Sequence, residues 1–349
     1  MRRAPVFIVG LPRSGTTLLQ GLLSSSPEAY SLPETHFFSV ILPELAKRPD
    51  ELLAPSDVVS LLELVRKMME LGLPRARLEA KAEAQELTGK DVFECILEHY
   101  RPPGGGAGLR VIEKTPGHVE YLEQIAGQYP AAAFVHVVRD PRNAISSVLQ
   151  APFNATRWLT WHAVRWSMTL RLVEAFAARK GERIVSVRYE DLVMNTADVL
   201  QKVCEFVGLA YDERMLDRYA DQVERNVLER ELAWKEDAGG PIRYEPLAWK
   251  NRLTAGEAWL IEQHSRRGME KYGYTPVARP GVSAALGALW DDWRLLRRDR
   301  EAQRNCMWLA KHCMALGDQA AARKLALFYV SVEPNKIRRR PVRRMILGA

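Results

Sequence analysis

The feature that most constrains this chain is a glycine loop placed between a short apolar run and an amphipathic helix. Residues 6–9 are all apolar and have the length of a buried strand. Gly10 and Gly15 follow, and a helical pattern runs from Thr16 to about Ser24. Backbone N–H groups at such a helix start face outward and bind anions. The pattern therefore predicts a phosphate cradle in an α/β fold.

The loop departs from the nucleoside triphosphate motif at the position that defines that motif. The motif places Lys and then Ser or Thr after its second glycine, and this lysine reaches the β/γ-phosphates. Here Thr16 and Thr17 occupy these positions, and the cation stands earlier, at Arg13. We therefore expect a phosphate-like anion other than ATP or GTP, held by Arg13, Ser14, Gly15, Thr16 and Thr17.

A second strand-like run, residues 132–138, is apolar except for His136 and is followed by Arg139, Asp140 and Pro141. Asp140 can cap the following helix, and Pro141 suits its first turn. Arg139 emerges at the strand end and Ser147 lies two turns into the helix, so both can face a phosphate at the carboxyl edge of the sheet. Two alternatives are open. Asp140 could order Mg²⁺ in a nucleotidase strand, or Arg139 could pair with a neighbouring carboxylate.

These two segments resemble the 5′-phosphosulfate loop and the 3′-phosphate element of sulfotransferases that use 3′-phosphoadenosine 5′-phosphosulfate (PAPS). The first match is Pro-Arg-Ser-Gly-Thr-Thr-Leu at residues 12–18, and the second is a strand-terminal Arg139 followed eight residues later by Ser147. The chain is similar to the bacterial type of this family and to tyrosylprotein and carbohydrate sulfotransferases. The resemblance spans residues 5–274 and implies a P-loop-like three-layer α/β domain with a central parallel sheet.

Two further matches complete the nucleotide site that the resemblance implies. The apolar strand at residues 184–188 ends in Tyr189-Glu-Asp-Leu, and the family places this Tyr near the adenine. A core tyrosine at a strand end is the alternative. Residues 249–252 read Trp-Lys-Asn-Arg and resemble a segment that carries basic residues near the 3′-phosphate. We assign that role to Lys250, with Arg252 as the runner-up.

The resemblance also implies the catalytic residues. Related sulfotransferases carry a Glu-Thr whose Glu is the general base, and Glu34-Thr35 matches it, with His36 as the rival base. A solvated loop carboxylate is the alternative for Glu34. Lys114 follows the strand at residues 109–112 and matches a lysine placed against the bridging oxygen of the phosphosulfate. Together with Arg13, it would stabilise charge during transfer, unless it is a surface lysine.

The expected reaction is in-line transfer of the sulfuryl group from PAPS to an acceptor hydroxyl. Sulfuryl carries less negative charge than phosphoryl, so protein cations can replace Mg²⁺ and no metal is expected. Cys306 and Cys313 lack the spacing of a zinc pair. A P-loop-type nucleotide kinase or phosphotransferase and a non-catalytic nucleotide-binding scaffold are the rival hypotheses. Carbohydrate, lipid, small alcohol or phenol, and peptide tyrosine all stay open as acceptors.

Length and patterning suggest one catalytic domain, residues 1–276, followed by a smaller extension, residues 277–349. A proline-broken apolar stretch at about residues 40–100 predicts a helical insertion over the acceptor site. Trp158, Trp161 and Trp166 fit a core stripe better than an aromatic acceptor platform. The sequence shows no apolar run of membrane-spanning length, and four unpatterned cysteines indicate reduced thiols and a cytoplasmic setting.

The basic character of the chain comes from the extension. Residues 277–349 contain 15 Lys and Arg against 6 Asp and Glu, whereas the whole chain has a net charge of +7. Small and apolar residues there resemble a single tetratricopeptide-like helical hairpin, which cannot bury its own face. We expect it to dock on the catalytic domain or on a second subunit of a homodimer. The arginine run at 338–344 is expected to be a solvated tail, and no nucleic-acid recognition module accompanies it.

Overall fold

The computed structural model describes residues 3–39, 87–104, 108–228, 239–315, 317 and 319–332, with the single positions 76, 80 and 83. Most of the expected insertion at 40–100, and the whole arginine run at 338–344, lie outside the described residues. The chain divides into two compact units. The sheet unit comprises Met1–Val138 and Phe176–Tyr244, and the helical unit comprises Arg139–Ala175 and Glu245–Ala349.

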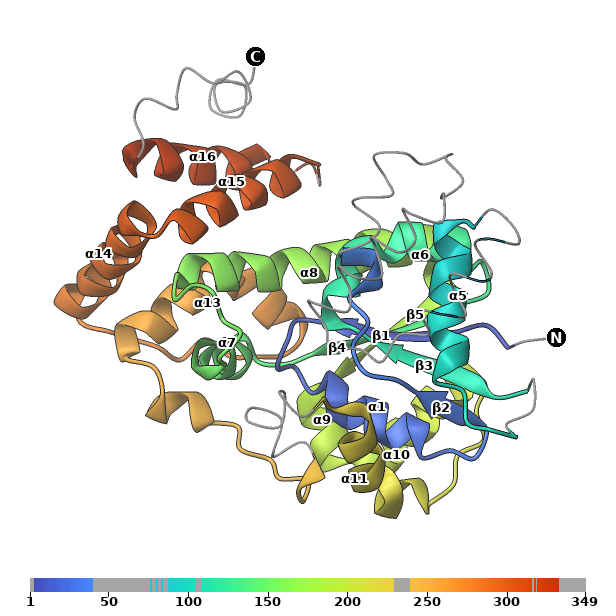
Figure 1. Cartoon of the computed structure of the whole chain (residues 1–349). Helices are drawn as coiled ribbons and strands as arrows, with labels where there is room; N and C mark the ends of the chain where they lie inside the picture. The colour runs from blue at the N-terminus through green and yellow to red at the C-terminus, as the bar shows by residue number, and fades with distance from the viewer. Residues whose placement is uncertain are drawn as a thin grey trace. The chain divides into compact units, whose positions relative to one another are not determined.

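The sheet unit is built on five parallel strands in the order β2-β3-β1-β4-β5 (Figure 1). They are β1 (Val6–Gly10), β2 (Ala29–Ser31), β3 (Arg110–Lys114), β4 (Ala133–Val138) and β5 (Ile184–Arg188). The chain places β2 and β3 on one side of β1 and then crosses over to place β4 and β5 on the other. Open α/β sheets bind ligands beyond the carboxyl ends of the strands at such a crossing. The expected parallel sheet is confirmed.

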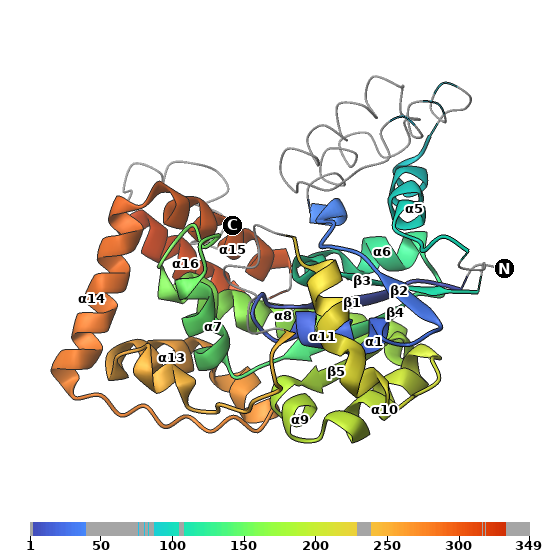
Figure 2. The same cartoon turned by 60° about the horizontal axis from the view of Figure 1, so that its bottom comes forward.

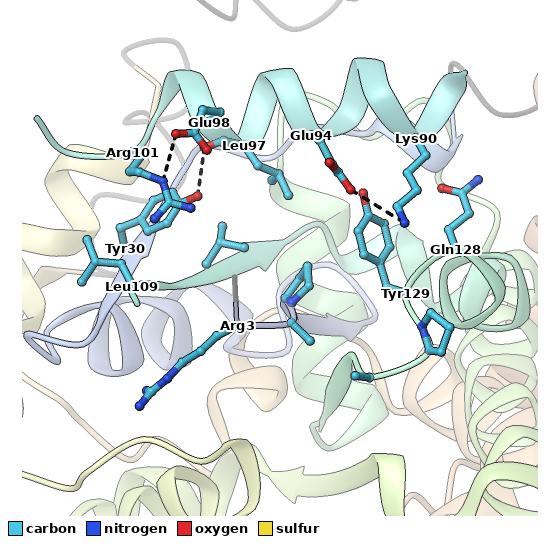
Figure 3. A pocket seen from close by; sticks show the side chains of 15 residues that line it. Arg3, Tyr30, Lys90, Glu94, Leu97, Glu98, Arg101, Leu109, Gln128 and Tyr129 are labelled. Atoms are coloured by element: carbon cyan, nitrogen blue, oxygen red, sulfur yellow. Dashed lines mark hydrogen bonds and ion pairs between the residues drawn. The ribbon is translucent and has the colours of Figure 1, made fainter. Parts of the chain in front are cut away.

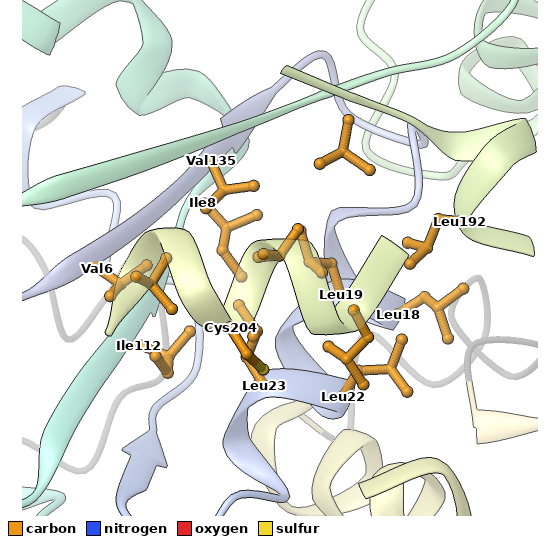
Figure 4. Close-up of a cluster of buried hydrophobic side chains, with 14 of the residues drawn as sticks. Val6, Ile8, Leu18, Leu19, Leu22, Leu23, Ile112, Val135, Leu192 and Cys204 are labelled. Carbon is orange, nitrogen blue, oxygen red and sulfur yellow. The ribbon is translucent and has the colours of Figure 1, made fainter. Parts of the chain in front are cut away.

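Alternation along β1 explains why both faces of the sheet are covered by helices. Val6 and Ile8 join a core with apolar residues of α1 (Thr16–Ser24), α9 (Tyr189–Met194), α10 (Thr196–Val207) and α11 (Met215–Asn226) (Figure 4). Phe7 belongs to the opposite face, where its ring centroid lies 6.2 Å from that of Phe38 and 6.3 Å from that of Phe93. Side chains alternate between faces with a period of two, so one apolar strand supplies two cores.

The second face is covered by α5 (Gly89–His99), the 3-10 helix η1 (Pro116–Tyr121) and α6 (Leu122–Gln128). Figure 2 shows α5 and α6 on one side of the strands and α1, α10 and α11 on the other. Helices, sheet and helices therefore form the three layers expected from the sequence. The chain enters α5 through a capping box in which Thr88 and Asp91 satisfy each other's backbone N–H groups.

The helical unit contains α7 (Pro141–Gln150), the first part of α8 (Leu159–Lys180), the 3-10 helix η5 (Ala248–Asn251) and α13 (Ala255–Lys271). Asp140 caps α7 by accepting the Arg142 N–H at 2.9 Å, and Pro141 takes the first helical position, which confirms the predicted cap. Trp158 and Trp166 are buried, as a core stripe requires. None of the described helices has the length and apolar character needed to cross a membrane.

The described part of the extension forms α14 (Val282–Arg298), α15 (Arg300–Ala315) and α16 (Gln319–Val332). Buried residues of these helices, among them Cys306, share a core with Trp158 and Met168. Asp292 of α14 also accepts the Leu159 N–H at 2.8 Å, at the start of α8. The hairpin thus buries its apolar face against residues that precede the extension in the chain. Its kinship with tetratricopeptide repeats, and the domain boundary at residue 276, stay predictions.

Candidate active site

The glycine loop between β1 and α1 has a backbone suited to holding an anion. Arg13 and Gly15 adopt φ values of 68° and 95°, in the left-handed region. Between them, the Ser14 N–H donates to the Leu11 carbonyl at 3.3 Å. Alternation of left-handed and ordinary conformations turns successive N–H groups toward one side, which forms an anion-binding concavity. Thr16 opens α1, so the unpaired N–H groups of the first helical turn add to this concavity.

The Ser14 hydroxyl provides a test of whether the loop fits a phosphate or sulfate group. The side chain of Ser14 is buried, and its oxygen has no hydrogen-bond partner among the described residues. Buried hydroxyl groups are rarely left unpaired in folded proteins. An anion held in the cradle would supply the missing acceptor, so the residues present fit such a group.

Tyr189 lies against the cradle, although its segment is far away in the sequence. It is the first residue of α9 and follows β5 directly. A Cβ atom added to Gly15 would lie only 2.2 Å from Tyr189 Cδ2, which shows how closely the ring approaches the loop. Tyr189 also packs on the core under α1, so it makes the core contact that the sequence analysis gave as the alternative to a place near the adenine. The adenine contact stays a prediction.

Replacing Gly15 with alanine is expected to destabilise the protein. The positive φ and the Tyr189 ring both exclude a Cβ, and strain of this kind costs about 1–3 kcal/mol of unfolding free energy. Thermal denaturation measures the effect, and Gly127→Ala in α6 is the matched control, because nothing lies within 4 Å of a Cβ there. A melting temperature of Gly15→Ala equal to that of the control would contradict the close approach of Tyr189.

Glu34 and Lys114 meet at the carboxyl end of β3. They are 80 residues apart in the chain, and the Lys114 ammonium donates to Glu34 Oε1. The Lys114 side chain is 0% exposed and that of Glu34 12%, so each charge has its partner in a nearly dry setting. His36 Nε2 lies 3.2 Å from the second oxygen of Glu34. The structure therefore joins the predicted base, its rival and the predicted lysine in one cluster.

Lys114 is part of β3, whereas the sequence analysis placed it after a strand ending at residue 112. Parallel pairing with β1 continues through Glu113 and Lys114, whose partners are Phe7 and Ile8. Its backbone bonds hold Lys114 beside the strand that runs into the glycine loop two residues later. The lysine is also fully buried, which rules out the alternative of a surface side chain.

Sequence reasoning missed the buried carboxylate next to this pair. Glu113 accepts hydrogen bonds from Thr35 Oγ1 at 2.9 Å and Thr115 Oγ1 at 2.7 Å, and its other oxygen lies 3.0 Å from His118 Nδ1. Burial raises the pKa of Glu113, but the interaction with His118 and the hydrogen bonds from the two hydroxyl groups outweigh it, so the pKa lies below its usual value. The available signal was the run Glu-Lys-Thr-Pro-Gly-His, which puts Glu113 and two of its partners within six residues.

Arg139, Ser147 and Lys250, the residues expected near a 3′-phosphate, belong to the helical unit. Arg139 follows the last residue of β4, and its carbonyl accepts the Trp166 indole N–H at 3.0 Å. Ser147 is buried on α7, and Lys250 is exposed on η5, near the ring of Trp249.

Asn143, which the sequence analysis did not single out, ties η5 to α7. Its amide group donates to the Pro246 carbonyl at 2.9 Å, and its oxygen accepts the Trp249 N–H at 3.0 Å. The segment that carries Lys250 is thereby fixed on the helix that carries Ser147. The runner-up, Arg252, follows η5 directly.

Asp140 is held by Arg142 as well as by the backbone. The guanidinium of Arg142 lies 2.6 Å from Asp140 Oδ2 and 2.7 Å from Glu262 Oε1. Both oxygens of Asp140 therefore accept hydrogen bonds from Arg142. This arrangement supports the capping role of Asp140 over the alternative in which it orders Mg²⁺.

A cavity of about 230 Å³ lies at the other end of the sheet (Figure 3). Its wall includes Pro5, Leu109 and Pro130, which come just before β1, β3 and β4, and α5 contributes Lys90 and Glu94. The glycine loop and Lys114 stand at the carboxyl ends of the strands. The cavity is therefore separate from the cradle and is not a continuation of it.

Comparison with known proteins supplies independent findings. A family model described as the sulfotransferase family matches residues 5–213. Protein-tyrosine sulfotransferase 2 of Gallus gallus is 22% identical over 287 residues, covering 79% of this chain and 70% of that protein. Protein-tyrosine sulfotransferase 1 of Danio rerio is 21% identical over 216 residues, covering 60% of this chain and 55% of that protein. The match thus spans about half the length of the Danio rerio relative.

Among solved structures, the sulfotransferase domain from the Synechococcus PCC 7002 olefin synthase has a similar fold. Its TM-score is 0.54 at 20% identity, and the match covers 79% of this chain and 97% of that domain. The likeness concerns the arrangement of strands and helices.

Proposed function

The chain belongs to the sulfotransferase family, and from that premise we propose that it transfers the sulfuryl group of PAPS to the hydroxyl group of an acceptor. The observation that carries this proposal is the contact of the buried Lys114 with the partly buried Glu34, beside the strand that runs into the glycine loop. A base and a cation next to an anion cradle are the groups that sulfuryl transfer needs. A kinase would instead need a lysine within the loop, where this chain has Thr16.

In this proposal the donor is held by residues from several elements. Arg13, the N–H groups of residues 15–17 and the Ser14 hydroxyl bind the 5′-phosphosulfate, because the Ser14 N–H already donates to the Leu11 carbonyl. Tyr189, which already lies against the loop, contacts the adenine. Arg139 and Ser147 bind the 3′-phosphate, and Lys250 adds charge near it. The left-handed backbone at Arg13 and Gly15 and the orphaned Ser14 hydroxyl support the first of these roles.

The reaction follows from the chemistry of the Glu34–Lys114 pair. The acceptor oxygen attacks sulfur in line with the leaving group, the bond from sulfur to the 5′-phosphate oxygen breaks, and 3′,5′-adenosine bisphosphate leaves. Glu34 takes the proton of the acceptor hydroxyl. Lys114 stabilises the negative charge that develops on the leaving oxygen. An ammonium group has three N–H donors, so Lys114 can retain Glu34 while it reaches the donor.

The acceptor, the cellular setting and the oligomeric state are further proposals. The names of the relatives favour peptide tyrosine as the acceptor, while carbohydrate, lipid and small alcohol or phenol acceptors require the same base. The cytoplasmic setting inferred from the cysteines and the homodimer inferred from the extension also stay predictions.

Calorimetric titration tests the proposed function without knowledge of the acceptor. We expect 3′,5′-adenosine bisphosphate to bind with micromolar affinity, equally with and without Mg²⁺, and to bind more tightly than ATP or AMP. The reason is that the cradle would bind the 5′-phosphate and Arg139 the 3′-phosphate of the same ribose, whereas ATP and AMP lack the 3′-phosphate. A preference for ATP with Mg²⁺ would favour the phosphotransferase, and binding of none of the three would favour the scaffold.

Arg139→Ala is expected to weaken binding of 3′,5′-adenosine bisphosphate about 10- to 100-fold, because a charged hydrogen bond to phosphate is worth roughly 1.5–3 kcal/mol. The same titration measures it, and AMP is the matched ligand, since AMP lacks the 3′-phosphate and should bind both proteins alike. Equal affinity of the variant and the parent for the bisphosphate would remove Arg139 from the 3′-phosphate site.

A further inference from the structure

Glu113 is a fully buried carboxylate whose partners come from three separate segments. Thr35 belongs to the turn after β2, Thr115 follows β3, and His118 lies in η1. All three contact Glu113 at 2.7–3.0 Å, and Glu113, Thr115 and His118 are 0% exposed. An ionised carboxylate accepts hydrogen bonds and donates none, so it fixes the direction in which each of these side chains donates.

The partners of Glu113 in turn hold the backbone of the segment that carries the proposed base. Thr115 Oγ1 accepts the Thr35 N–H at 3.1 Å and the His36 N–H at 3.4 Å. His118 Nε2 accepts the Phe38 N–H at 3.3 Å, which places the ring proton on Nδ1, facing Glu113. Through these contacts one carboxylate determines where residues 35–38 lie.

Glu34 and Lys114 are both sequence neighbours of residues that bind to Glu113 or of Glu113 itself. Glu34 immediately precedes Thr35, and Lys114 stands between Glu113 and Thr115. His36, which contacts Glu34, has a φ of 47°, a conformation that residues other than glycine rarely adopt. The hydrogen bond that the His36 N–H donates to Thr115 Oγ1 helps to hold that conformation. Because Lys114 and Glu113 are successive strand residues, their side chains leave β3 on opposite faces.

We propose that Glu113 is the positioning residue of the site: by binding Thr35, Thr115 and His118 it sets the separation and direction of Glu34 relative to Lys114. This inference rests on the proposed sulfuryl transfer. Glu113 touches neither the donor nor the acceptor in this arrangement. It acts through Thr35 on the base and through β3 on the lysine.

The test compares Glu113→Gln with variants of Thr35 in the full-length protein. An amide adds N–H donors where three donors already converge, so at least one contact must be lost. We expect kcat of sulfuryl transfer to fall about 10- to 100-fold, the effect of a displacement of roughly 1 Å. The KM for PAPS and the affinity for 3′,5′-adenosine bisphosphate should stay within twofold, because the glycine loop is not part of the network.

Thr35 supplies a milder variant and a rescue. Thr35→Val removes the hydroxyl group that donates a hydrogen bond to Glu113. It should lower kcat and leave the KM for PAPS within twofold of the parent. Thr35→Ser keeps a hydroxyl group at this position and should restore kcat. Adding Thr35→Val to Glu113→Gln should lower kcat little further, because both changes remove the same contact. The matched control is Asp292→Asn, the same change at a buried carboxylate of the helical unit, with kcat expected within twofold of the parent.

The outcomes separate this inference from the proposed function. If the parent transfers sulfuryl groups and folded Glu113→Gln and Thr35→Val both keep its kcat, Glu113 has only a structural role and the inference is wrong. Equal loss of kcat in Thr35→Ser and Thr35→Val would also contradict it, because the serine hydroxyl can still donate to Glu113. If the parent binds no bisphosphate and has no activity with PAPS, the proposed function fails and the positioning role fails with it.

Discussion

Glu34→Gln is expected to lower kcat about 10²- to 10⁴-fold, the range that a general base contributes. Glutamine has nearly the same shape and can still accept the hydrogen bond from the buried ammonium of Lys114. It cannot take a proton from the acceptor hydroxyl. The change should therefore slow the transfer step without weakening donor binding. We expect the affinity for 3′,5′-adenosine bisphosphate to stay within twofold of that of the parent. Initial rates with labelled PAPS and calorimetry measure the two effects separately.

Two comparisons make the Glu34 result specific. Glu28→Gln is the matched control, because Glu28 is a carboxylate of the same unit that pairs with Arg3 at the protein surface. It should retain the kcat of the parent. His36→Gln tests the rival base, which lies 3.2 Å from Glu34. If His36→Gln loses activity while Glu34→Gln keeps it, His36 is the base and the assignment of Glu34 is wrong.

The glycine loop and its helix could be predicted because short-range rules fix them. The helix expected from Thr16 to about Ser24 is observed over Thr16–Ser24, directly after the positive φ of Gly15. Asp140 and Pro141 start α7 for equally local reasons, a side-chain cap and a fixed φ. In each case the start of the helix is determined by residues that lie close together in the sequence.

Glu113 could not be predicted in the same way. The strand predicted from the sequence ends at residue 112, before Glu113 and Lys114. The observed strand continues through Glu113 and Lys114, which pair with Phe7 and Ile8 of β1. The Glu113 carboxylate finds Thr35, 78 residues earlier in the chain, together with Thr115 and His118. Burial of a carboxylate depends on such distant partners, which neither periodicity nor composition reveals.

The contact between Glu34 and Lys114 could be predicted only in part. A resemblance to sulfotransferases gave each residue a separate role, whereas the pairing of β3 with β1 brings Lys114 to the edge where Glu34 lies. Whether the expected insertion at about 40–100 covers the acceptor site stays a prediction, because most of it falls outside the described residues.

Lys114→Met is expected to lower kcat about 10²- to 10³-fold without a matching loss of stability. Removing one well-placed stabiliser of developing charge costs roughly 3–4 kcal/mol of transition-state energy. Methionine has a similar length and fills a position that is 0% exposed, but it removes the ammonium partner of Glu34, a loss that costs roughly 3–5 kcal/mol when the remaining charge is fully buried and unpaired. Glu34 keeps some exposure and its contact with His36. Activity and melting temperature should therefore respond differently, which a purely structural lysine would not produce.

Lys90→Met is the matched control for this prediction, since Lys90 is an exposed lysine of the same unit. Its kcat should equal that of the parent. Combining Lys114→Met with Glu34→Gln then tests how the two groups work together. Residues that act as one unit lose less in combination than the sum of their separate losses, so the double variant should be little slower than the slower single variant. Retention of parental kcat by Lys114→Met would show that the leaving oxygen is stabilised by another cation, and Arg13 would be the next to replace.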